Sequence, residues 1–142
     1  MKRVLVPCDG SENALRAVGY AARTAGQSRH PIEVVLLHVL DPMTFRSPAA
    51  ALAPNELMRL RPAQAERVLG PARAILDDAG VPYRECCRVG QPASEIAAVL
   101  HDEHYDGVIM GTRGLGAFAR LMVGSVASRV VNLVDVPVTL IK

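Results

Sequence analysis

The sequence GVIMGTRGLG, residues 107–116, joins a short apolar run to a cluster of glycines and decides the fold that we expect. Gly107–Met110 has the length and apolar character of a strand that is buried on both faces. The glycines follow at once, and Gly124-Ser125 stands where a helical pattern begins. A strand that runs into a glycine-rich turn and then a helix is typical of parallel α/β sheets.

The rest of the chain alternates in the same way between short β-branched runs and longer segments of helical period. Pro7 is expected to end the first strand, and Ser11 to cap the helix that follows it. The expected strands are Arg3–Val6, Glu33–Val39, Tyr83–Val89, Gly107–Met110 and Val138–Ile141. The expected helices run from Ser11 to near Gly26, from Asn55 to Ala79, from Pro92 onward, and from Ser125 to Leu133.

Two further segments qualify this pattern. Asp41–Pro54 holds three prolines and several small residues, and is expected to form a long loop. Pro62 and Gly70-Pro71 lie inside the second helix, which we therefore expect to be kinked or broken. With no internal repeat and no composition break, the sequence predicts one domain over residues 1–142.

Composition excludes several classes of function. The 16 basic and 14 acidic residues nearly balance, and no basic run indicates a nucleic-acid partner. The longest apolar block, Val34–Leu40, is far shorter than a membrane span. The three cysteines are an odd number without metal spacing, and the neighbours Cys86 and Cys87 should point to opposite faces of a strand. We expect a soluble cytoplasmic protein.

The glycine-rich segment has the chemistry of a phosphate cradle. Gly111 and Gly114 allow positive φ and lack the Cβ that would hold a phosphate away, and Gly124 does the same before a helix. The first N–H groups of that helix and its dipole favour an anion, and Ser125 adds a hydroxyl. Arg113 and Arg120 could supply charge-assisted bonds.

These glycines could equally do no more than shape a loop and cap a helix, because a bare Gly-x-Gly match is weak. A Walker-type P-loop is excluded, since no Gly-Lys-Ser/Thr is present. A dinucleotide fingerprint is also excluded, since the glycines follow the fourth strand and not the first.

The spacing Gly111-x-x-Gly114, nine residues, Gly124-Ser125 resembles the nucleotide-binding signature of the universal stress protein family. The flanking segments are similar to the family as well, and the resemblance covers essentially the whole chain: Val4–Ser11, Leu37-His38-Val39, Gly90-Gln91-Pro92 and Val136-Pro137-Val138. It implies a three-layer, Rossmann-like α/β sandwich of the adenine nucleotide alpha hydrolase-like type, with a parallel sheet in the order 3-2-1-4-5.

The resemblance also implies roles for individual residues in binding ATP. Asp9 would lie near the ribose, and Val39 would receive the adenine through its backbone. The phosphates would be held by the Gly111–Gly114 loop and the helix that begins at Gly124-Ser125. The residues that would line this site are Pro7, Cys8, Asp9, Val39, Met110, Gly111, Arg113, Gly114, Gly124, Ser125 and Val126. Mg²⁺ would offset phosphate charge, although no dedicated ligand for it can be named.

Other residues have simpler interpretations. Taken alone, Asp9 could merely belong to the turn before Ser11. Cys8 is expected to be a small buried hydrophobe rather than a redox-sensitive thiol, and His38 a hydrogen-bonded structural residue rather than a base. The run His101–His104 is expected to be a solvated helix end and not a metal site.

The sequence thus predicts an ATP-binding regulator or switch with at most slow ATP hydrolysis, because no catalytic base is evident. The resemblance implies a homodimer through Val138–Ile141, which would lie at a sheet edge. The protein partner that it would regulate is unknown. Two rival hypotheses remain open: an interaction module of the same fold that binds no nucleotide, and a small nucleotide-dependent enzyme.

Overall fold

A computed structural model of the chain describes residues 1–45, 54–112 and 124–142, and it contains a five-stranded parallel sheet in the order β3-β2-β1-β4-β5. The predicted fold and strand order are therefore confirmed. The strands are β1 (Arg3–Cys8), β2 (Glu33–Leu40), β3 (Tyr83–Val89), β4 (Gly107–Gly111) and β5 (Val138–Ile141). The helices are α1 (Glu12–Gln27), α2 (Pro54–Ala79), α3 (Pro92–Asp102) and α4 (Ser125–Leu133), with a 3₁₀ turn, η1 (Pro42–Phe45), after β2.

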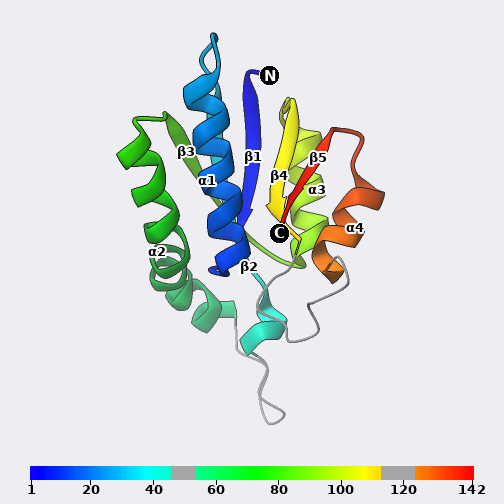
Figure 1. Cartoon of the computed structure of the whole chain (residues 1–142). Helices are drawn as coiled ribbons and strands as arrows, with labels where there is room; N and C mark the ends of the chain where they lie inside the picture. The colour runs from blue at the N-terminus through cyan, green and yellow to red at the C-terminus, as the bar shows by residue number, and fades with distance from the viewer. Residues whose placement is uncertain (46–53, 113–123) are drawn as a thin grey trace.

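The helices cover both faces of the sheet, with α1 and α2 on one and α3 and α4 on the other (Figure 1). Alternate residues of β1 show the two layers, because Val4 and Val6 pack toward α1 and α2 while Leu5 packs toward α3 and α4. Cys87 and Cys86 likewise lie in the first and the second layer, respectively, as predicted for neighbours on one strand.

Helix α1 forms where its sequence pattern places it. Ser11 is the N-cap, and its hydroxyl oxygen accepts a hydrogen bond from the Ala14 backbone N–H at 3.2 Å. The buried residues of α1 are Ala14, Ala17, Val18, Ala21 and Ala22, which is the predicted apolar face. The small side chains let the helix lie close to the sheet.

One prediction about proline is wrong, and one alternative of a second is ruled out. β1 does not end at Pro7 but continues through Cys8, and Pro7 is in register with Leu37 of β2. On its other side β1 pairs with β4 only at Val4 and Leu5, so the missing Pro7 N–H removes no bond there. α2 is one helix that contains Pro62 and Pro71, so it is not broken at either of them. Buried side chains anchor it on both sides of Pro71: Val68, Leu69, Ala72 and Leu76.

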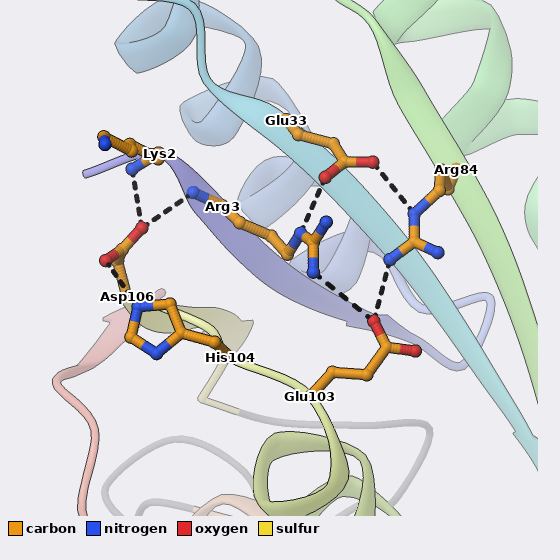
Figure 2. A network of polar contacts seen from close by, with 7 residues as sticks. All are labelled: Lys2, Arg3, Glu33, Arg84, Glu103, His104 and Asp106. Atoms are coloured by element: carbon orange, nitrogen blue, oxygen red, sulfur yellow. Dashed lines mark hydrogen bonds and ion pairs between the residues drawn. The ribbon is translucent and has the colours of Figure 1, made fainter.

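Because all strands are parallel, they begin at one edge of the sheet, the amino edge, and end at the opposite one, the carboxyl edge. The amino edge carries a closed ring of ion pairs from four side chains (Figure 2). Glu33 receives Arg3 Nε at 2.6 Å and Arg84 Nε at 2.8 Å. Glu103 receives Arg84 NH2 at 2.9 Å and Arg3 NH1 at 3.5 Å, which completes the ring.

A second carboxylate at the amino edge binds the backbone. Asp106 Oδ2 accepts hydrogen bonds from the N–H groups of Lys2 at 2.6 Å and Arg3 at 2.8 Å, while Oδ1 lies 3.4 Å from His104 Nε2. The Asp106 N–H in turn donates to the Arg3 carbonyl at 2.9 Å. These bonds attach the start of β1 to the segment that leads into β4.

Candidate functional site

The ladder between β1 and β4, the two strands at which the connections reverse direction across the sheet, stops short of the carboxyl edge, and we call this gap in the pairing the opening. β1 pairs with β2 as far as Cys8, in register with His38, but with β4 only as far as Leu5, in register with Val108. The last residues of β1 therefore have a ladder partner on one side only. Ligands of open α/β sheets bind at such a switch point.

Asp9 lies on one side of this opening, directly after β1. Its side chain is exposed, and Oδ1 accepts a hydrogen bond from the Ser11 N–H at 2.9 Å. Asp9 thus forms the turn before α1, which was the simpler of its two interpretations. The bond uses one carboxylate oxygen and leaves Oδ2 outside the turn, so the same side chain can still accept a hydroxyl from a ligand.

The two residues that flank the glycine-rich segment, Thr112 and Gly124, lie next to each other. Gly124 N–H donates to the Thr112 carbonyl at 2.5 Å, and Thr112 N–H donates to the Ile141 carbonyl at 2.8 Å. The segment between them, residues 113–123, lies outside the described residues, and so do the predicted site residues Arg113 and Gly114. The Thr112–Gly124 bond fixes the ends of this segment beside β4 and β5.

Helix α4 begins at this junction without a side-chain cap. α1 is capped by Ser11 and α3 by Gln91, whose Oε1 accepts from the Ser94 N–H at 2.9 Å, whereas Gly124 offers no side chain to α4. The first N–H groups of a helix have no partner within the helix, and the helix dipole adds partial positive charge there. Ser125, the first residue of α4, is exposed. An anion with acceptor oxygens suits this position.

Gly111 is required for a reason that the sequence did not reveal. It ends β4 in extended conformation and, like Gly124 with φ −60°, does not use the positive φ that glycine allows. A Cβ at Gly111 would lie 2.9 Å from Asn13 C and Cβ and 3.1 Å from Ala14 N. The missing Cβ therefore makes room for the first turn of α1.

Three predicted site residues belong to the apolar layer beneath α3 and α4. Met110 is buried there, and Val39 and Val126 are half-buried against the same core. They come from β2, β4 and α4, whose ends meet at the carboxyl edge. An apolar wall beside a polar opening is what a flat aromatic ring needs.

Pro7 and Cys8 complete the predicted set. Pro7 is half-buried, and Cys8 is buried in the layer beneath α1 and α2. Burial, and to a lesser extent the charge of Asp9, raises the pKa of the Cys8 thiol to about 12. The thiol is therefore protonated at neutral pH, as expected of a small buried hydrophobe.

Two polar side chains at this edge were missed as site candidates. Thr112 is 8% exposed, and its hydroxyl oxygen has no hydrogen-bond partner among the described residues. His38 is 4% exposed, and its Nε2 has none either. The sequence offered two signals for them: a hydroxyl directly after a buried strand, and a histidine near the end of an apolar strand. Buried polar atoms without partners are rare and mark places where another group can bind.

No described part of the chain brings together three or more His, Cys, Asp or Glu side chains that could hold a metal ion. Within the run His101–His104, Glu103 joins the ion-pair ring and Asp102 lies 4.0 Å from Arg88. In addition, none of the helices in residues 1–45, 54–112 and 124–142 is long and apolar enough to cross a membrane.

Comparison with known proteins identifies the family. The model of the universal stress protein family matches residues 1–142, and the chain belongs to that family. A universal stress protein of Thermus aquaticus is 33% identical over 99% of this chain and 98% of its own. The solved structure of MJ0577, a universal stress protein of Methanocaldococcus jannaschii, superposes with a TM-score of 0.83 at 29% identity, covering 99% of this chain and 95% of its own.

More distant structures of the same fold contain adenine nucleotides. They are universal stress proteins in complex with cAMP, from Archaeoglobus fulgidus with dAMP, and from Arabidopsis thaliana with AMP. Their identities to this chain are 21% to 23%, their TM-scores are 0.70 to 0.72, and the matches cover at least 99% of this chain and 92% of theirs. At that identity the likeness establishes the fold.

Proposed function

We propose that this chain is a single-domain protein that binds an adenine nucleotide, ATP, in the opening between β1 and β4. The observation that carries the proposal is the loss of β1–β4 pairing beyond Leu5 and Val108, which leaves the Asp9 turn and the junction of Thr112 and Gly124 without a ladder between them. The three nucleotides named for structures of this fold share adenine, a sugar and one phosphate, which are the parts that the proposed site would bind.

Each part of the nucleotide would meet a different element. The adenine would lie against the apolar layer of Val39, Met110 and Val126, with Pro7 and Cys8 forming the floor of the opening. The ribose hydroxyls would donate to Asp9. The phosphates would accept hydrogen bonds from the uncapped first turn of α4, from Ser125 and from the Thr112 hydroxyl. Arg113 and Gly114, predicted phosphate contacts, remain predictions because they lie outside the described residues.

The role that follows is that of a nucleotide-dependent regulator in the cytoplasm. Phosphoryl transfer requires a positioned base or water and charge on the transferring group. In this proposal Asp9 would bind the ribose, and the Cys8 thiol beside it is buried and neutral, so neither side chain would supply that machinery. We therefore propose at most slow hydrolysis, with Mg²⁺ bound through the phosphates and not through a protein cage.

The test starts from the purified protein. Any co-purified nucleotide is identified by chromatography after denaturation, and ATP, ADP, AMP and cAMP are titrated by calorimetry with and without Mg²⁺ while phosphate release is followed. Binding of ATP with turnover slower than once per minute supports the proposal. Absence of binding at millimolar ATP favours an interaction module without nucleotide, and rapid turnover favours an enzyme.

A charge variant locates the phosphates. Ser125→Asp places a carboxylate at the start of α4, where it should stabilise the helix by about 0.3–1 kcal/mol through the helix dipole. The same charge should repel a phosphate and weaken ATP binding by tenfold or more. Gln27→Glu makes the same change in net charge at the exposed last turn of α1 and should leave ATP binding unchanged. Equal affinities of the Ser125→Asp variant and the wild type would place the phosphates elsewhere.

We also propose a homodimer through β5. β5 is the last strand of the sheet, and its four residues are only half-buried although three of them are apolar. An unpaired strand edge with apolar side chains favours pairing with a second copy. Sedimentation equilibrium at micromolar concentration should give twice the mass of the chain, and a monomer would contradict the proposal.

A further inference from the structure

His38 makes a contact that links β2 to the start of the candidate site. Its Nδ1 lies 3.3 Å from the Cys8 carbonyl oxygen, at the residue that ends β1 and precedes Asp9. Cys8 and His38 are register partners in the sheet, so the side chain of one strand bonds the backbone of its neighbour. Beyond Leu5, β4 no longer pairs with β1, and this contact helps to hold the strand end from the remaining side.

The chemistry of the contact fixes the tautomer of the ring. A carbonyl oxygen only accepts, so Nδ1 must carry a proton and donate it. Burial lowers the pKa of His38 and keeps the ring neutral, because the hydrogen bond to Cys8 and the charge of Asp9 offset only part of the burial effect. In a neutral ring with Nδ1 protonated, Nε2 is an acceptor, and Nε2 is the buried atom without a partner among the described residues.

The Cys8 carbonyl belongs to the same peptide unit as the Asp9 N–H. A peptide unit is planar, so a bond to its carbonyl fixes the direction in which the next residue leaves the strand. Asp9 is held on its other side by the bond from the Ser11 N–H to Oδ1 at 2.9 Å. The two bonds together determine where Oδ2 lies relative to the opening.

We infer that His38 is a positioning residue that orients Asp9 toward the sugar of a bound nucleotide through the Cys8 carbonyl. The inference rests on the proposed function. It adds a residue of β2 that contributes to recognition of the sugar, although Asp9 itself follows β1. His38 acts on binding only through Asp9, and its effect depends on which ring nitrogen donates.

Two matched amide variants separate the ring nitrogens. The Asn side chain places its NH₂ group near the position of Nδ1, whereas the longer Gln side chain places it near Nε2. The readout is the ratio of affinities for ATP and 2′,3′-dideoxy-ATP, which lacks both sugar hydroxyls. We expect the wild type to prefer ATP by about tenfold, His38→Asn to keep most of that preference, and His38→Gln to lose it. Altered packing alone would change both affinities together.

Asp9→Ala completes the test. In the Asp9→Ala background, a further change of His38→Gln should leave both affinities unchanged, because the group through which His38 acts is gone. A wild type that binds no ATP would refute the proposed function. A wild type that binds ATP while His38→Gln keeps the full preference for the hydroxyls would refute the inference alone.

The tautomer can be measured without any ligand. Long-range ¹H–¹⁵N spectra of the wild-type protein should show His38 protonated at Nδ1 and bare at Nε2. A ring protonated at Nε2, with the His38 signals assigned through its own backbone resonances in the wild-type protein, would overturn the inference even if neither variant folds.

Discussion

The two edges of the sheet differ in how fully their polar groups are paired. At the amino edge, Arg3, Glu33, Arg84 and Glu103 neutralise one another in a ring, and Asp106 binds two backbone N–H groups. At the carboxyl edge, the Thr112 hydroxyl and His38 Nε2 have no partner among the described residues, and α4 begins without a side-chain cap. One edge contributes polar stabilisation to the sheet, and at the other two buried polar atoms have no partner among the described residues.

The largest expected effect comes from a glycine that joins the two sides of the candidate site. Gly111→Ala should destabilise the fold by roughly 1–3 kcal/mol, because the new Cβ meets the Asn13 backbone at 2.9 Å. It should also weaken ATP binding, since α1 starts immediately after the Asp9 turn. Gly26→Ala is the control: a Cβ there meets nothing within 4 Å and should stabilise α1 by up to about 1 kcal/mol. If urea unfolding gives Gly111→Ala and Gly26→Ala the same free energy of unfolding, close packing against Asn13 is not the reason for a glycine at position 111.

A smaller effect is expected from the amino edge. Glu33→Gln removes the charge that bridges Arg3 and Arg84 and should lower the free energy of unfolding by roughly 0.5–1 kcal/mol, since these side chains are 31% to 48% exposed. The loss should shrink at high salt, and ATP affinity should not change. Glu12→Gln, which breaks an exposed pair with Arg16, should cost less. An altered ATP affinity in Glu33→Gln would show that the two edges are coupled.

The pH dependence of stability provides a second test of the amino edge. Hydrogen bonds from the Lys2 and Arg3 backbone N–H groups hold the pKa of Asp106 below its usual range. A carboxyl with a lower pKa in the folded state contributes stability that is complete above its unfolded pKa of about 3.9 and is lost as the pH falls through the folded value. Asp106→Asn should therefore lose less stability on acidification than the wild type. If an NMR titration gives Asp106 an ordinary pKa, its hydrogen bonds do not explain the loss of stability at low pH.

The smallest change is expected at Cys8. Because burial, aided by the charge of Asp9, raises the thiol pKa to about 12, almost no thiolate exists at pH 8. Iodoacetamide should leave Cys8 unmodified in the native protein and modify it after denaturation, as measured by peptide mass spectrometry. Rapid labelling of native Cys8 would instead favour a redox-sensitive thiol beside the ligand.

Elements with strong local signals were predicted to the residue. α4 and β5 begin and end where the sequence places them, because Gly124-Ser125 and Pro137 mark their starts. The buried face of α1 follows from the spacing of its alanines. The error at Pro7 arose because the effect of a proline depends on which neighbouring strand it meets, and that is a tertiary property.

The candidate site was predicted as a set of positions but not as a set of contacts. The sequence brings Asp9, Val39, Met110, Gly111, Gly124 and Ser125 to one edge, since parallel strands end together. It did not reveal that Gly111 accommodates Asn13, or that His38 bonds the Cys8 carbonyl. Both contacts join residues that are far apart in the chain, and no local pattern encodes them.

The ring of ion pairs at the amino edge has a consequence for heating. The dehydration penalty of charged groups falls as temperature rises, whereas hydrophobic stabilisation per unit area levels off. The four charges shared by β1, β2, β3 and the end of α3 should therefore account for a growing fraction of stability in warm solution. A measurement at 25 °C alone would underestimate the contribution of the ring to the free energy of unfolding. That contribution is best obtained from the slope of the unfolding free energy with temperature.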